Sequence, residues 1–249
     1  MNSLEIIVPL LVALTMLLIL NKFRYIKLTE IQSRVSGKIA VFKKWNGEKL
    51  LTINGFAQSV SVEDRSIKKS YWYKISELAL KRSPQNILFL GLGAGSMNQI
   101  IYSLNKEVKQ TVIELDPSII DISQEFFEID KIKSLKIIQA DAFKVIRDPK
   151  KFALNLKFDV VIIDLYNGEP PYVSPYSSQS AFVTQITKLI TPQGCLIFNR
   201  PDHSPEARQI NQKLINYLSS KFKIVETYPV TDPRGYKNNA VVATNFLIH

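Results

Sequence analysis

The sequence predicts an α/β protein with a doubly wound, mostly parallel sheet and a small β-meander in front of it. Short apolar runs that end in glycine or an acid alternate with helical spacing from residue 86 onward. Two Asn-Gly pairs, Asn46-Gly47 and Asn54-Gly55, separate β-rich segments between residues 37 and 62, which predicts a three-stranded meander. The 249 residues, 46% of them hydrophobic, suffice for one domain with a modest addition.

Residues 86–104 form the predicted entry to the sheet. The apolar run 87–90 breaks into Gly91, Gly93 and Gly95, and apolar residues at helical spacing follow up to Leu104. Glycines let the backbone turn sharply and approach a ligand, because a Cβ would block both. A tight turn from strand to helix without a ligand is the alternative, since a short glycine motif alone is weakly specific.

A second predicted strand, residues 109–115, carries Glu114 at its tip. An acid in this place, about 20 residues after the glycines, can accept hydrogen bonds from the two hydroxyls of a ribose. The spacing is G-x-G-x-G and not G-x-G-x-x-G. It favours a ligand without phosphate, such as an adenosyl sulfonium, over a nicotinamide dinucleotide. Ser96 can stand in for the last small residue, so a dehydrogenase stays an alternative.

An acid also follows the third predicted strand, residues 135–139, and another ends the fourth, residues 158–164. These acids are Asp141 and Asp164. Ligands of open α/β sheets bind outside the carboxyl ends of the strands, so the acids and the glycines together predict a binding site there. Each acid alone also fits a helix cap. Later strands are expected at 194–199, 223–228 and 240–246, with a helix at 205–220.

The N-terminal residues 6–20 are almost wholly apolar and are followed by Lys22, Arg24 and Lys27. This pattern predicts a single membrane anchor with the globular part in the cytoplasm. A cleaved signal peptide would need positive charge before the run and small residues after it. The alternative is a helix packed on the protein itself, because the run is shorter than about 20 residues and contains Pro9.

Composition argues against other classes of function. Cys195 is the only cysteine, so a disulfide framework is excluded. The two histidines form no cluster with metal-ligand spacing, and no metal is expected. The net charge of +10 comes from scattered lysines without a dense arginine stripe. Anionic lipid headgroups are therefore a simpler partner than nucleic acid.

A set of motifs occurs in order between residues 37 and 245. The set is N-G-x-x-Q ending in Gln58, a tyrosine at a helix head (Tyr71), G-x-G-x-G, E-L-D at Glu114 to Asp116, A-D-A-F with Asp141 and Ala142, and I-I-D-x-x-N with Asp164 and Asn167. It resembles the spermidine synthases, the polyamine aminopropyltransferases. The resemblance implies a methyltransferase-like Rossmann fold, often dimeric, that binds decarboxylated S-adenosylmethionine, transfers an aminopropyl group to a small amine and releases methylthioadenosine.

The resemblance also implies roles for single residues. Gln58 would face the nucleoside or its sulfonium arm, Glu114 would hold the ribose hydroxyls, and Asp164 would accept a proton from the attacking amine. The cofactor-binding set is Gln58, Gly91, Gly93, Gly95, Glu114, Asp141 (to the adenine amino group) and Ala142. The acceptor-binding set is Tyr71, Tyr166, Asn167 and Asp232.

The acceptor half departs from the family pattern. Ala94 and Asn167 stand where the family has aspartates, Trp72 and Tyr73 replace a polar pair, and Asp232 replaces the tyrosine of a Y-P-x-G element. Charge-assisted contacts contribute about 1.5–3 kcal/mol each, so a diamine should bind several kcal/mol more weakly unless Asp232 restores one charge. Trp72 and Tyr73 either line an altered acceptor pocket or pack between meander and sheet.

Two other functions stay open. One is a methyltransferase that takes intact S-adenosylmethionine, whose carboxylate Ala94 would admit, and acts on a membrane-associated acceptor. The other is a non-catalytic nucleoside-binding module, against which the acid at Asp164 argues. The predicted division is an anchor with its basic flank (1–27), a meander with a linking helix (28–82) and a nucleoside-binding transferase domain (83–249).

Overall fold

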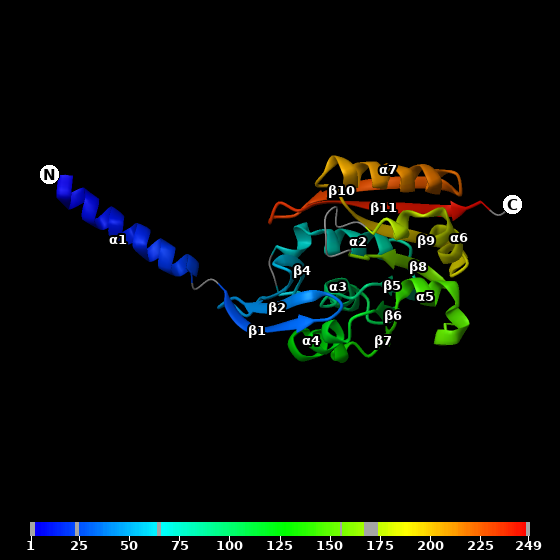
Figure 1. The fold of residues 1–249 in the computed structure, drawn as a ribbon, viewed down its shortest axis with the longest axis horizontal. Helices are drawn as coiled ribbons and strands as arrows, with labels where there is room; N and C mark the ends of the chain where they lie inside the picture. The colour runs from blue at the N-terminus through cyan, green and yellow to red at the C-terminus, as the bar shows by residue number, and fades with distance from the viewer. Residues whose placement is uncertain (1–2, 23–24, 64–65, 155, 167–173, 248–249) are drawn as a thin grey trace.

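The computed structural model describes residues 3–22, 25–63, 66–154, 156–166 and 174–247. It contains a four-stranded antiparallel sheet followed by a seven-stranded sheet that is flanked by helices on both faces (Figure 1). The predicted fold class is confirmed.

The N-terminal sheet has one strand more than the sequence predicts. Its strands are β1 (Ile26–Ser33), β2 (Gly37–Lys43), β3 (Lys49–Ile53) and β4 (Phe56–Val60). The additional strand, β1, pairs with β2, but the register shifts between Lys27 and Thr29. This irregularity interrupts the alternation of apolar residues that identifies a strand in sequence. The Asn-Gly pairs lie at the two hairpin turns that follow, as predicted.

The main sheet has the strand order β10-β11-β9-β8-β5-β6-β7. Neighbours from β7 through β9 are parallel, and β11 runs antiparallel to both β9 and β10. Its strands are β5 (Asn86–Leu90), β6 (Lys109–Glu114), β7 (Leu135–Gln139), β8 (Phe158–Ile163), β9 (Ile190–Pro201), β10 (Phe222–Thr231) and β11 (Lys237–Phe246).

The helices divide between the faces of this sheet because strand residues alternate in direction. Phe89 of β5 belongs to the core under the meander and the helices α2–α4, whereas Leu88 and Leu90 belong to the core under α5–α7. The α-helices are α2 (Tyr71–Leu80), α3 (Ser96–Leu104), α4 (Pro117–Phe127), α5 (Ala142–Arg147), α6 (Ser180–Thr187) and α7 (Pro205–Ser219). Short 3-10 turns are η1 (Ile67–Lys69), η2 (Ile129–Lys131), η3 (Pro149–Phe152) and η4 (Tyr176–Ser178).

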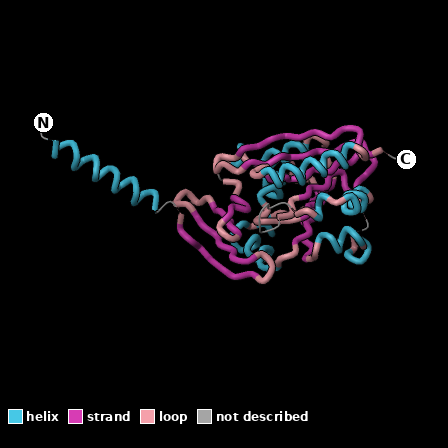
Figure 2. Tube along the Cα trace, turned by 45° about the horizontal axis from the view of Figure 1, so that its top comes forward, coloured by secondary structure: helices cyan, strands magenta, loops and turns pink. Residues whose placement is uncertain are grey.

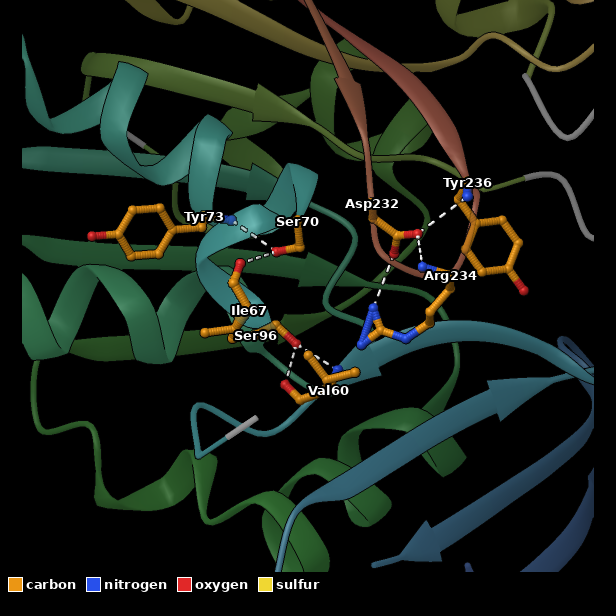
Figure 3. A network of polar contacts seen from close by, with 8 residues as sticks. All are labelled: Val60, Ile67, Ser70, Tyr73, Ser96, Asp232, Arg234 and Tyr236. Carbon is orange, nitrogen blue, oxygen red and sulfur yellow. Dashed lines mark hydrogen bonds and ion pairs between the residues drawn. The ribbon is translucent and has the colours of Figure 1, made fainter. Parts of the chain in front are cut away.

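The predicted linking helix is preceded by the 3-10 turn η1, and Ser70 separates this turn from α2. The Ser70 hydroxyl accepts a hydrogen bond from the Tyr73 N–H (3.3 Å) and so caps α2 (Figure 3). The cap makes Tyr71 the first residue of α2, at the edge of the main cavity.

At the N-terminus, α1 (Ser3–Lys22) extends away from both sheets (Figures 1 and 2). Its apolar side chains between Ile7 and Met16 are more than half exposed. Across the residues that the structure describes, no helix combines the length and apolarity that crossing a bilayer requires.

Candidate active site

A cavity of about 920 Å³ lies between the meander and the carboxyl ends of the parallel strands. Its wall comes from the tip of the β1–β2 hairpin, from β4, from the head of α2, and from the loops that follow β5, β6, β7 and β8. The end of β9 and the start of β11 complete it. The cavity thus lies where ligands of doubly wound sheets bind.

The strand order puts the predicted ligand-binding groups in a row. Because β7, β6, β5 and β8 are neighbours, Asp141, Glu114, the glycine loop and Asp164 follow one another along the sheet edge. Three steps between strands span about 14 Å, a length that suits an extended nucleoside with a side arm.

The three glycines of the loop have different surroundings. Gly91 (φ 97°) and Gly93 line the cavity, and a Cβ on Gly91 would collide with the backbone oxygen of Asp164. Gly95 is not among the cavity-lining residues, and its Cβ would collide with the side chain of Ile129. Packing against the protein itself therefore explains Gly95, in line with the alternative of a tight turn.

The meander is fastened to this loop by two serines of β4 and α3. The Ser59 hydroxyl accepts from the Ala94 N–H (2.7 Å), and the Ser96 hydroxyl donates to the Val60 carbonyl (2.6 Å), as Figure 3 shows for Ser96. The N–H groups of Leu92 and Gly95 are also engaged, by Glu114 and by the Leu92 carbonyl. Since a pyrophosphate binds to free N–H groups at such a turn, these bonds disfavour the dehydrogenase alternative.

Glu114 ends β6 and lines the cavity. One carboxylate oxygen accepts from the Leu92 N–H and the other from the Asp116 N–H, both at 2.9 Å. Burial raises the pKa of Glu114, and these backbone hydrogen bonds oppose the rise. A carboxylate oxygen has a second lone pair, so each can still accept from a ribose hydroxyl.

Three other predicted cofactor residues line the same cavity. Asp141 caps α5 by accepting from the Phe143 N–H (2.8 Å), and Ala142 is the first residue of that helix. Gln58 lines the cavity from β4. The cap role and a ligand role are compatible for Asp141, because the cap uses one oxygen only.

Asp164 follows β8 directly and is half-buried. Its Oδ1 accepts a hydrogen bond from Asn199 Nδ2 (2.7 Å). Burial raises the pKa of Asp164 to about 6, and the bond from Asn199 opposes the rise. Tyr71 lines the cavity nearby: burial, followed by the negative charge of Asp164, raises the pKa of Tyr71 well above its ordinary value.

The other predicted acceptor residues divide three ways. Tyr166 lines the cavity, and Asn167 lies outside the described residues. Asp232 is not among the lining residues, because its carboxylate closes the β10–β11 turn: it accepts from the Arg234 and Tyr236 N–H groups (2.8 and 3.1 Å) and pairs with the Arg234 guanidinium (2.9 Å), as Figure 3 shows. Its charge is already neutralised by Arg234.

Trp72 lines the cavity and is at the same time packed into the core. It is 2% exposed, and the Arg234 guanidinium lies 5.6 Å from its ring centre. Tyr73 packs against the core without lining the cavity. Both expectations for the aromatic pair therefore hold in part.

Sequence reasoning missed two parts of this wall. The first is Asn199, near the end of β9, together with Asn238, at the start of β11. Asn199 carries the same signal as the acids, since it ends an apolar run. The second is the β1–β2 tip, residues 32–37, which had no signal because β1 itself was not predicted. Within the described ranges, no group of three His, Cys, Asp or Glu side chains could hold a metal ion.

Comparison with known proteins identifies relatives in sequence and in fold. The chain is similar to the polyamine aminopropyltransferase of Vibrio vulnificus, with 24% identity over 192 residues that cover 75% of this chain and 60% of the relative. It resembles a spermidine synthase solved in complex with the transition state analogue AdoDATO, with a TM-score of 0.66 and 17% identity over 89% of this chain and 74% of the other. Human methyltransferase-like protein 13 in complex with SAH gives a TM-score of 0.57 and 19% identity, over 70% and 82%.

The family model described as spermine/spermidine synthase domain matches residues 69–245. The matched segment begins before α2 and ends at the last but one residue of β11, so it includes the seven-stranded sheet except for Phe246. The chain belongs to the spermine/spermidine synthase domain family.

Proposed function

We propose that this protein is a transferase that binds a sulfonium nucleoside along the ends of β5 to β8 and passes its aminopropyl group to a small amine. The observation that carries the proposal is the position of Asp164 on the same cavity as Glu114 and Tyr71, where burial raises the pKa of Asp164 to about 6. The name of the Vibrio vulnificus relative and the AdoDATO and SAH complexes of structural neighbours support it.

The row of groups along the sheet edge fits the parts of such a cosubstrate. Asp141 would meet the adenine amino group and Glu114 the ribose hydroxyls, which leaves the sulfonium arm beside the glycine loop. The reacting carbon would then lie toward β8, on the side of Asp164. Holding donor and acceptor in line lowers the entropic part of the barrier.

The transfer step then balances as a simple displacement. The amine nitrogen attacks the methylene carbon next to the sulfonium, the C–N bond forms as the C–S bond breaks, and the sulfur keeps the electron pair. The products are methylthioadenosine and an ammonium, whose proton passes to the Asp164 carboxylate. A base with a pKa near 6 is ionised at neutral pH and still accepts a proton effectively. Its negative charge also stabilises the developing ammonium.

Acceptor choice depends on the charges at this end of the cavity. Among the described lining residues, Asp164 is the carboxylate next to Tyr71, and Asp232 is bound to Arg234. The distal ammonium of a diamine would need a further acid, because a buried cation without a partner is costly. We therefore propose an amine acceptor and expect a diamine to bind more weakly than it does in enzymes with the full acidic set.

A second candidate is methyl transfer from intact S-adenosylmethionine. The feature in its favour is Ala94, which leaves the glycine loop without an acid, although Ala94 is fully buried and does not itself line the cavity. Because the loop has no acid at this position, it presents no negative charge there that would repel the donor's carboxylate. The two candidates share the nucleoside site and differ in the group transferred.

Calorimetry on the full chain separates them. We expect methylthioadenosine and decarboxylated S-adenosylmethionine to bind, with release of methylthioadenosine when a primary amine is added. Tighter binding of the intact donor, with transfer of a methyl group, would support the second candidate instead. Binding without any turnover would leave a nucleoside-binding module, and no binding of any of the three ligands would remove the proposed site.

A further inference from the structure

Two asparagines stand behind Asp164, one after the other. Asn199 Nδ2 donates to Asp164 Oδ1 (2.7 Å), and Asn238 Nδ2 donates to Asn199 Oδ1 (2.8 Å). Both asparagines line the cavity. The three side chains come from the neighbouring strands β8, β9 and β11, so the register of the sheet brings them together.

The direction of this chain of hydrogen bonds follows from chemistry. An ionised carboxylate only accepts, so Asn199 must turn its NH2 group toward Asp164. The two ends of an amide have nearly the same shape, and their orientation is set by the partners of both. Asn238 donates to the oxygen of Asn199, and this bond exists only when the NH2 group of Asn199 faces Asp164.

Asp164 depends on this arrangement for its orientation. Among the described side chains, Asn199 donates a hydrogen bond to the Asp164 carboxylate, and this bond engages one of the two carboxylate oxygens. The other oxygen is left for the acceptor in the cavity. A hydrogen bond to the charged form favours ionisation, and here it acts against the burial of the group.

We propose that Asn199 and Asn238 form a two-amide relay that positions Asp164 as the base: Asn199 orients the carboxylate, and Asn238 acts through Asn199 by fixing the direction of its amide. The proposal rests on the proposed function, in which Asp164 accepts the proton. Neither asparagine contacts the reacting atoms, so both are positioning residues.

The relay is tested by a double-mutant cycle with two readouts on the full chain. The first readout is the carboxyl titration of Asp164 by carbon NMR, assigned with Asp164→Asn, which needs no turnover. The second is the pH profile of kcat for methylthioadenosine release from decarboxylated S-adenosylmethionine with a primary amine. Methylthioadenosine affinity, measured by calorimetry, reports on the integrity of the nucleoside site.

Asn199→Ala should raise the Asp164 pKa by about one unit, because the bond to the charged form is lost. The lost orientation of the carboxylate should lower kcat at neutral pH about tenfold, beyond the roughly twofold effect of the raised pKa, and methylthioadenosine affinity should stay within about twofold. Asn238→Ala should shift both readouts in the same direction by less. The double variant should match Asn199→Ala alone, because Asn238 acts only through Asn199.

Two further variants control for general damage. Asn239→Ala removes an amide of the same strand that donates to Asp202 (3.2 Å), and neither of these residues lines the cavity. It should leave both readouts unchanged. Asn238→Asp keeps the size of the side chain but presents only acceptors, so the two carboxylates compete for the NH2 group of Asn199. The Asp164 pKa should rise and kcat should fall, in the same direction as in Asn199→Ala.

Additive effects of the two alanine variants would overturn the relay, as would an unchanged Asp164 pKa in Asn199→Ala. Asn238→Asp with the activity and pKa of the unmodified chain would do the same. The proposed function fails differently, because Asp164→Asn would then retain turnover. If the asparagine variants shift the Asp164 pKa as predicted but the protein shows no turnover, the positioning of the carboxylate is supported and the base role is refuted.

Discussion

Replacing Asp164 by Asn should make the protein more stable while it removes turnover. Burial raises the pKa of Asp164 from 3.8 to about 6, against the hydrogen bond from Asn199. The folded state therefore holds the proton more tightly than the unfolded state. Above pH 6 the carboxylate is charged in both states, and its desolvation penalises the folded one by roughly 3 kcal/mol. An amide at this position carries no such penalty and can still accept from Asn199.

The pH dependence fixes the sign of the effect. The penalty is absent below pH 3.8, grows between pH 3.8 and 6, and is complete above pH 6, as the folded-state pKa of about 6 requires. In urea unfolding we expect Asp164→Asn to be about 2–3 kcal/mol more stable than the unmodified chain at pH 8, and equally stable near pH 4. Turnover should fall about 100-fold or more, the usual contribution of a general base.

A matched control is Asp121→Asn on the exposed surface of α4, which should change stability by no more than about 0.5 kcal/mol at either pH. A variant of Asp164 that is no more stable than the unmodified chain at pH 8 would show that the carboxylate is not desolvated. Retained turnover would remove the base role.

Four other predictions follow from the same geometry. Glu114→Ala should weaken methylthioadenosine binding about tenfold or more in calorimetry, because hydrogen bonds to a charged group are lost; unchanged affinity would refute the ribose role. In pH profiles, kcat/KM should rise about tenfold per unit up to the Asp164 pKa of about 6 and level off above it, whereas a profile flat from pH 4 to 8 would contradict a titrating base. Asp232→Ala should destabilise the β10–β11 turn by about 1–3 kcal/mol in urea unfolding, since the Arg234 guanidinium and two N–H groups lose their acceptor; equal stability would refute this structural role. The full chain should sediment with anionic vesicles and a chain without residues 1–24 should not, as the predicted anchor requires; equal sedimentation would contradict the anchor.

Much of the main sheet could be predicted because the relevant signals are local. Apolar runs that end in a polar residue identify β5, β6, β7 and β8, and the rule for carboxyl ends then brings Glu114, Asp141 and Asp164 to one edge. Strand order is not needed for this inference, since all four strands are parallel.

The parts that sequence reasoning missed depend on contacts between distant residues. Asn199 and Asn238 meet only because β9 and β11 are adjacent in a particular register. β1 lacks the alternation of a strand because of its shift opposite β2, so the hairpin tip over the cavity could not be expected.

Contacts within the protein explain the residues whose surroundings differ from expectation. Asp232 is two residues from Arg234, and the ion pair across the turn engages the carboxylate that was expected at the acceptor. Gly95 is required by the side chain of Ile129 and not by a ligand. In both cases the predicted residue is present, and a contact within the protein accounts for it.

The most direct test of the account is a crystal structure of the full chain soaked with methylthioadenosine. The account predicts density for the nucleoside along the ends of β5 to β8, with the ribose hydroxyls within hydrogen-bond distance of Glu114 and the thioether sulfur on the side of Asp164. An empty cavity at saturating ligand, or a nucleoside bound elsewhere, would contradict it.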